Sequence, residues 1–68
     1  MSPEKMVHMA NQIAGFFNTQ PDIDPAESVA NHLRDFWAPP MREQLRAYVR
    51  DGGAGLNETV LRASRMIG

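Results

Sequence analysis

Three polar side chains in the middle of the sequence have the residue types of a hydrolytic triad. Ser28, His32 and Asp35 are separated by four and three residues, so a helix would place them on one face. Acyl transfer also needs oxyanion-stabilising donors and an enclosed pocket, and the surface of one helix supplies neither. We therefore expect this face to be solvated or to contact a partner, and we predict that the chain is not an enzyme.

The sequence also argues against a metal or nucleotide site. His8 and His32 are its two histidines, and the absence of cysteine leaves no thiol to complete a zinc shell. The run Gly-Gly-Ala-Gly at 52–55 follows no strand pattern and precedes no Gly-Lys-Ser/Thr, so it lacks the context of a phosphate-binding loop. These glycines are better explained as a helix end and a turn, and we expect no cofactor or metal bound by this chain.

The segment HLRDFWAPPMR, residues 32–42, combines aromatic, proline and arginine residues and includes the only Trp. Arginine then recurs every four residues, at Arg42, Arg46 and Arg50, which would form a stripe along a helix. Trp and Arg are enriched where the binding energy of protein interfaces is concentrated. We predict a partner-binding corner, anchored by the area of Trp37 and by bidentate hydrogen bonds of Arg34 and Arg42 to acids or carbonyls. Its predicted residues are His32, Arg34, Trp37, Pro39, Arg42 and Arg46.

The same residues are also compatible with a core, a solvated helix face or a nucleic-acid-binding motif. Trp37 is in phase with Val29 and Leu33, as a core residue of a helix would be. The arginines are consistent with a solvated face whose aliphatic stems cover the edge of a core. A helix-turn-helix that binds nucleic acid is a further alternative, although the acids Asp35 and Glu43 would then lie close to the phosphates.

Four segments with helical spacing of apolar residues must position all of these side chains. The predicted helices lie near residues 3–18, 25–37, 40–51 and 57–67 of one domain, residues 1–68. The fold class is therefore all-α, a small bundle of four short helices. The last helix is short, and we expect it to need support from the others.

The residues at the boundaries agree with these four segments. Ser2 and Asn57 are residue types that cap helix N-termini. Asp24 and Glu27 match a capping box, in which Asp24 accepts from the Glu27 amide and Glu27 bonds back. The proline pair at 39–40 stops the second helix and opens the third.

Length and charge limit the classes of function. A chain of 68 residues without cysteine builds only a marginal core, so we expect either well-packed helices or a partner to stabilise it. The net charge of −1 combines −3 in residues 1–33 with +2 in residues 34–68, where all six bases are Arg. No apolar run approaches the roughly 20 residues of a membrane span. We expect a cytoplasmic protein that binds neither membrane nor nucleic acid.

Several short motifs follow one another in a fixed order within residues 10–61. They are Ile13-Ala14 with Phe16-Phe17, Val29-Ala30, His32-Leu33-Arg34, Phe36-Trp37, Pro39, Met41-Arg42, Leu45 and Gly52-Gly53-Ala54-Gly55-Leu56. In this combination the chain resembles the delta subunit of NAD-dependent, molybdenum-containing formate dehydrogenase. The residue before Pro39 is commonly Asp in that family and the one after it polar or basic, whereas this chain has Ala38 and Pro40.

The resemblance implies a small cytoplasmic accessory subunit of an enzyme that oxidises formate. Its expected partner is the catalytic alpha subunit, and its expected role is in complex assembly or in the cofactor-loaded state. Molybdopterin guanine dinucleotide, iron–sulfur clusters and FMN would belong to the other subunits. A small DNA-binding or transcription-related module, and a self-associating scaffold that forms a homodimer when isolated, are the alternatives.

Overall fold

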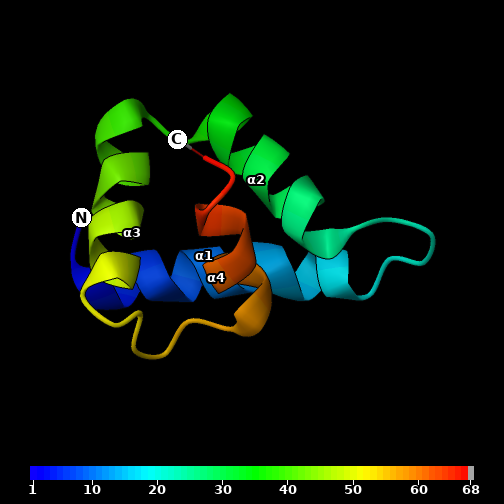
Figure 1. The fold of residues 1–68 in the computed structure, drawn as a ribbon, viewed down its shortest axis with the longest axis horizontal. Helices are drawn as coiled ribbons and strands as arrows, with labels where there is room; N and C mark the ends of the chain where they lie inside the picture. The colour runs from blue at the N-terminus through cyan, green and yellow to red at the C-terminus, as the bar shows by residue number, and fades with distance from the viewer. Residues whose placement is uncertain (68) are drawn as a thin grey trace.

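The computed structural model describes residues 1–67, which form four α-helices (Figure 1). They are α1 (Pro3–Asn18), α2 (Pro25–Phe36), α3 (Pro39–Arg50) and α4 (Glu58–Ser64). The predicted all-α fold class is confirmed. Gly68, the last residue of the expected domain, lies outside the described residues. Among those described there is no helix with both the length and the hydropathy that a membrane crossing requires.

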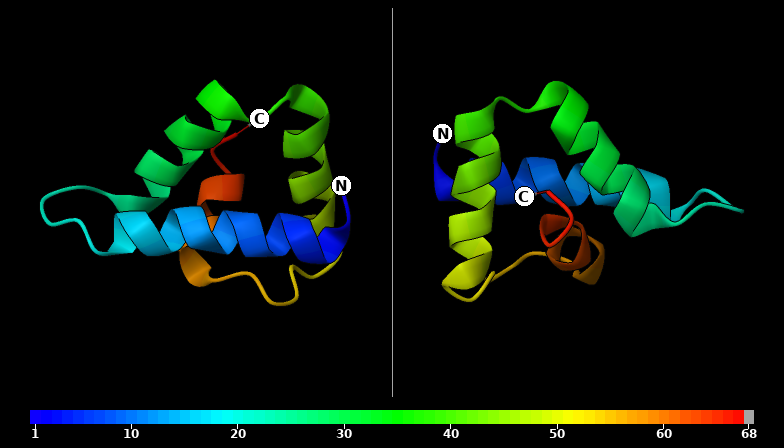
Figure 2. Two further views of the ribbon diagram at one scale, coloured as in Figure 1. Left: turned by 180° about the vertical axis from the view of Figure 1, so that it is seen from behind. Right: turned by 45° about the horizontal axis from the view of Figure 1, so that its top comes forward.

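α1 is the base of the fold, and α2 and α3 rise from its opposite ends (Figure 1). A short corner at residues 37–38 joins α2 to α3, so these three helices outline a triangle. α4 lies inside this frame and packs on each of the other three helices (Figures 1 and 2). A helix of 7 residues is unstable alone, so this packing supplies the support that was expected for it.

The core forms where the four helices meet, and each helix contributes to it. Its largest fully buried side chains are Met6, Val29, Leu33, Leu45 and Val60. The buried polar residues of α4 are satisfied, because Thr59 Oγ1 donates to Asn18 Oδ1 at 2.8 Å and Ser64 Oγ donates to a carbonyl of its own helix. The Thr59 bond also ties α4 to the end of α1.

Three helices begin with side-chain caps, one of which differs from the prediction. Ser2 accepts from the Lys5 amide at 3.2 Å, and Asn57 accepts from the Val60 amide at 2.9 Å. Asp24 accepts from the amide of Ala26 at 3.0 Å, not from that of Glu27. The expected capping box is therefore wrong in detail: within residues 1–67 the cap is one-sided and reaches the second helical residue.

The remaining helix ends also differ by small amounts from the prediction. α2 ends at Phe36, one residue before the predicted end at 37. α3 begins at Pro39, one residue before the predicted start at 40, because proline fits the first helical position. α4 ends at Ser64 instead of near 67. Beyond it, the amides of residues 65 and 66 donate to carbonyls three residues back, and this turn buries Ile67, which is 3% exposed.

The loop of residues 51–57 is held closed by side chains of α1 and α3. Gly53 and Gly55 have φ of 65° and 83°, which favours glycine. Tyr48 Oη donates to the Ala54 carbonyl at 2.6 Å. Asn11 donates to the Gly55 carbonyl at 2.8 Å and accepts from the amide at the start of α4 at 3.0 Å. These bonds fix where α4 begins.

Candidate protein-binding surfaces

Trp37, the central residue of the predicted corner, belongs to the protein's own core. Its side chain is only 6% exposed and belongs to the buried cluster to which all four helices contribute. Trp37 therefore leaves little side-chain area for a partner, and its role as a partner contact stays a prediction. Its neighbour Phe36 is the outward residue of the corner, with 74% of its surface exposed.

Arg42 also acts within the protein. Its Nη1 donates to the carbonyl of Trp37 at 2.7 Å and lies 3.3 Å from the carbonyl of Arg34. The last carbonyls of a helix have no partner inside the helix, and a cation is favourable beside them. Arg42 thus closes the end of α2 across the corner, which is a different use from the expected bidentate contact with a partner.

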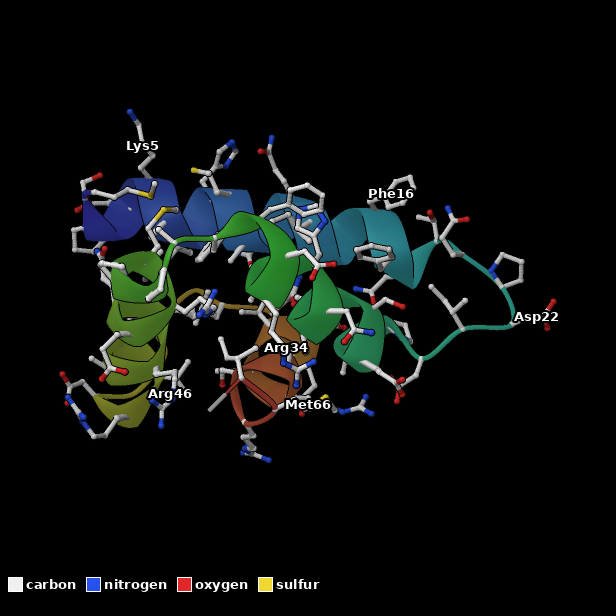
Figure 3. All side chains as sticks on the ribbon, turned by 90° about the horizontal axis from the view of Figure 1, so that it is seen from above. Lys5, Phe16, Asp22, Arg34, Arg46 and Met66 are labelled. Atoms are coloured by element: carbon white, nitrogen blue, oxygen red, sulfur yellow. The ribbon has the colours of Figure 1, made fainter. Side chains whose placement is uncertain are left out.

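Arg34 ties the C-terminal turn to α2. Its Nη1 donates to Asn31 Oδ1 at 2.7 Å, and its Nη2 donates to the carbonyl of Met66. Figure 3 shows Arg34 and Met66 side by side on one face of the molecule. Two of the three expected anchors, Arg34 and Arg42, therefore use guanidinium donors on backbone carbonyls.

The other three predicted residues do not share one surface. Pro39 is the exposed first residue of α3. Arg46 lies farther along α3, where its Nη1 is 2.9 Å from Glu43 Oε2. His32 is half-buried on α2 and contacts aromatic rings. The six predicted residues thus divide among the corner, an aromatic surface and a groove beside α3.

The aromatic surface consists of Phe16, Phe17, His32 and Phe36, from α1 and α2. Ring centroids are 5.3 Å apart for Phe16 and Phe17, 6.2 Å for Phe17 and His32, and 4.7 Å for His32 and Phe36. The two outer rings are exposed, Phe16 by 61% and Phe36 by 74%. Exposed, clustered aromatic side chains are typical of protein interfaces.

Sequence reasoning missed Phe16 and Phe36, although a signal for them exists. Each belongs to an adjacent aromatic pair, Phe16-Phe17 and Phe36-Trp37. Neighbouring residues on a helix point about 100° apart, so a single core accommodates one member of such a pair more easily than both. The structure places Trp37 inside and Phe17 partly inside, which leaves Phe16 and Phe36 outside.

The arginine groove lies between α3 and α4. It is an open hollow of about 220 Å³ lined by Glu43, Arg46, Val49, Arg50, Ser64 and Arg65. Three of these six residues carry a guanidinium and one carries a carboxylate. The groove is therefore cationic, although the whole chain carries a net charge of −1.

Residues 5–64 match a family model described as "NADH-dependant formate dehydrogenase delta subunit FdsD". The chain belongs to this FdsD family. The match includes the corner, both candidate surfaces apart from Arg65, and the loop of residues 51–57. Neither the curated proteins nor the solved structures gave a match.

The catalytic and metal sites weighed from the sequence find no support in the described part of this FdsD-family chain. Ser28, His32 and Asp35 make no hydrogen bonds to one another within residues 1–67, and the His32 ring contacts Phe17 and Phe36 instead. Over the same range no three His, Cys, Asp or Glu residues come together as a metal site.

Most amides of the glycine loop are used within the protein. A phosphate-binding loop points several free backbone amides at its ligand. Here the amides of residues 52, 53, 56 and 57 donate to groups of the protein itself. The glycines of this FdsD-family chain therefore serve the turn that leads into α4.

Proposed function

We propose that this chain is a non-catalytic accessory subunit of a cytoplasmic NAD-dependent formate dehydrogenase. It binds the catalytic alpha subunit and supports assembly of the complex or its cofactor-loaded state. The observation that carries the proposal is the aromatic surface on a member of the FdsD family. The docking corner is thus centred on Phe36, at the end of α2, instead of on Trp37.

Because Phe16 and Phe36 are exposed to water, a protein that covers them would gain free energy from burying their rings. Burying an aromatic side chain of this size contributes about 2 kcal/mol or more at an interface centre. The aromatic neighbours of these two rings are Phe17 for Phe16 and His32 for Phe36, and both neighbours are themselves only partly buried. A partner that covers them gains stabilisation which the folded chain by itself leaves unused.

The chain's own residues do not fit the cofactors of the proposed partner enzyme. Iron–sulfur clusters are held by Cys thiolates, and this chain has none. In the glycine loop, the amides of residues 52, 53, 56 and 57 are engaged within the protein, which leaves few amides for a pterin or flavin phosphate. Molybdopterin guanine dinucleotide, iron–sulfur clusters and FMN are accordingly assigned to the other subunits.

The nucleic-acid alternative is weakened by the use of the α3 arginines. A recognition helix presents its basic residues to the phosphates. Arg42 instead turns back to the end of α2, and Arg46 is paired with Glu43. The aromatic surface is also an unusual feature for duplex binding, which rewards net positive surfaces.

Co-purification with the alpha subunit tests the proposal. Phe36→Ser should weaken capture of the alpha subunit by about 30-fold, since truncating an interface hot spot costs about 2 kcal/mol. Phe36→Leu keeps an apolar side chain and should retain most of the binding. Met66→Ser is the matched control, because Met66 is an exposed apolar residue on the side of the molecule opposite Phe16 of the aromatic surface (Figure 3).

Circular dichroism of each variant shows whether helical content is kept. Undiminished capture by a folded Phe36→Ser variant would contradict the aromatic surface as the docking site. Failure of the unaltered chain to capture the alpha subunit would contradict the proposed function itself. A homodimer of the isolated chain that Phe36→Ser dissociates, without any alpha binding, would favour the self-associating scaffold.

A further inference from the structure

The arginines of the molecule fall into two groups by what their guanidinium groups contact. Arg34 and Arg42 donate to backbone carbonyls at the corner. Arg50 has a single ion pair within residues 1–67, a 3.9 Å contact with Asp51 in which both side chains are more than 70% exposed. An exposed pair at that distance contributes little. Arg65 has no hydrogen bond or ion pair from its side chain to any residue from 1 to 67.

These weakly engaged cations line the same hollow. The arginine groove brings Arg50 at the end of α3 together with Arg65 just beyond α4, and Arg46 completes the set. Folding alone does not account for this convergence, because three like charges along one groove repel one another. Glu43 compensates one of the three charges through its 2.9 Å contact with Arg46. The lining residues leave about two positive charges to attract an anionic group, and the exposed Asp51 beside Arg50 offsets a further charge only weakly.

The floor of the groove limits what that group can be. Val49 is the apolar residue of the lining, and the Ser64 hydroxyl already donates a hydrogen bond to the Leu61 carbonyl. The donors that face a ligand are therefore guanidinium groups, which bind carboxylates in a planar, bidentate manner. A volume of about 220 Å³ is that of roughly seven waters, which is enough for two short acidic side chains.

We propose that the arginine groove binds an acidic peptide segment of the partner enzyme subunit, with its carboxylates held by Arg46, Arg50 and Arg65. This inference rests on the proposed function and adds a second contact to it. Figure 3 shows Phe16 and Arg46 on opposite sides of the molecule, so one flat interface does not cover both surfaces. The molecule is 32 × 22 × 17 Å, and an extended segment of about ten residues spans such a distance.

A protein segment fits the groove better than nucleic acid does. Glu43 lines the groove and Asp51 sits at its end, where a phosphate backbone would meet both acids. Phosphate binding depends on releasing many counterions over a long basic track. Three arginines around one hollow suit the shorter, more separated charges of Asp and Glu side chains.

Fluorescence anisotropy with a labelled peptide of alternating Glu and Gly, ten residues long, tests the groove in the full chain. Binding should weaken as salt is raised and should fall about tenfold or more in Arg50→Gln with Arg65→Gln. The matched control is Lys5→Gln with Arg62→Gln, which removes the same charge from residues that do not line the groove. The control should keep most of the affinity. A peptide of alternating Gln and Gly should not bind.

Four results would overturn the inference, three with the peptide and one with the alpha subunit. With the peptide they are equal loss in the test and control variants, unchanged binding by the test variant, and tighter binding of a short DNA duplex than of the acidic peptide. Phe36→Ser should leave peptide binding unchanged, because the aromatic surface lies elsewhere. Peptide binding without capture of the alpha subunit would uphold the groove and refute the proposed function. Capture of the alpha subunit that is insensitive to the Arg50 and Arg65 substitutions would refute the groove as the second contact.

Discussion

The corner between α2 and α3 and the groove between α3 and α4 use the same side chain in opposite ways. At the corner, Arg42 and Arg34 point back at carbonyls that the end of α2 and the C-terminal turn leave without helix partners. In the groove, the side chains of Arg50 and Arg65 make no hydrogen bond to a carbonyl of residues 1–67. An arginine's role therefore follows from the backbone groups around it, and residue type alone does not identify an interface.

The aromatic residues show the same dependence on surroundings at the corner itself. Trp37 and Phe36 are neighbours in the sequence, and the more typical interface residue, Trp37, is the one that lies inside. The chain is small, so its only indole contributes more as core than as surface. Phe36, the last residue of α2, is left at the surface, while Trp37 in the corner turns toward the core.

Substitution at the corner should give the largest effect on stability. Trp37→Ala removes a buried indole, which costs about 3–5 kcal/mol, a large fraction of the stability expected for so small a domain. We expect this variant to be mostly unfolded at 25 °C, as measured by circular dichroism and urea titration. Phe36→Ala should change the free energy of unfolding by about 0.5 kcal/mol or less. Similar losses of stability in both variants would contradict the assignment of Trp37 to the core and of Phe36 to the surface.

Substituting a corner arginine should destabilise the fold more than substituting a groove arginine, although both effects should be smaller than that of Trp37→Ala. Arg42→Ala removes charged hydrogen bonds to the end of α2 and should lower the free energy of unfolding by about 1.5–3 kcal/mol. Arg50→Ala removes only an exposed contact of 3.9 Å, and the expected change is about 0.5 kcal/mol or less. Urea titration of the two variants side by side measures the difference. Equal free energies of unfolding in the two variants would contradict the distinction between arginines that stabilise the fold at the corner and arginines that line the groove.

Glu43→Gln should have the smallest effect on folding and a measurable effect on the groove. The Arg46–Glu43 pair is exposed, so its loss should cost about 0.5 kcal/mol or less. The variant leaves Arg46 without its carboxylate, and the acidic peptide should then bind a few-fold more tightly at low salt. Anisotropy titrations at two salt concentrations measure this change. Weaker peptide binding would indicate that Glu43 positions Arg46 for its ligand.

Much of the fold could be predicted from the sequence because its signals are local. Ser2, Asn57 and the proline at 39 act on residues within one turn of themselves, so the helix starts follow from short-range chemistry. The expected α4 was too long because Ile67 enters the core through a turn, and its burial depends on distant residues. The ordered motifs pointed to the family that the comparison then confirmed.

The candidate surfaces were less accessible to sequence reasoning. His32 and Arg46 were predicted to share a corner, yet they lie on different surfaces because α2 and α3 diverge from it (Figure 1). Arg65 was not among the predicted residues, since its relation to α3 depends on how α4 packs inside the frame. The aromatic pairs carried a readable signal, but the choice within each pair needed the direction of the core.

Local sequence features are enough to establish that the chain forms short helices, where most of them begin, and to which family it belongs. These properties depend on capping, helical periodicity and an ordered set of motifs. Packing of the four helices was needed to establish that Trp37 faces inward, that Arg34 and Arg42 bond to carbonyls, and that Arg46, Arg50 and Arg65 line one groove. Those outcomes depend on contacts between residues far apart in the chain, whose geometry exists only once the helices have come together.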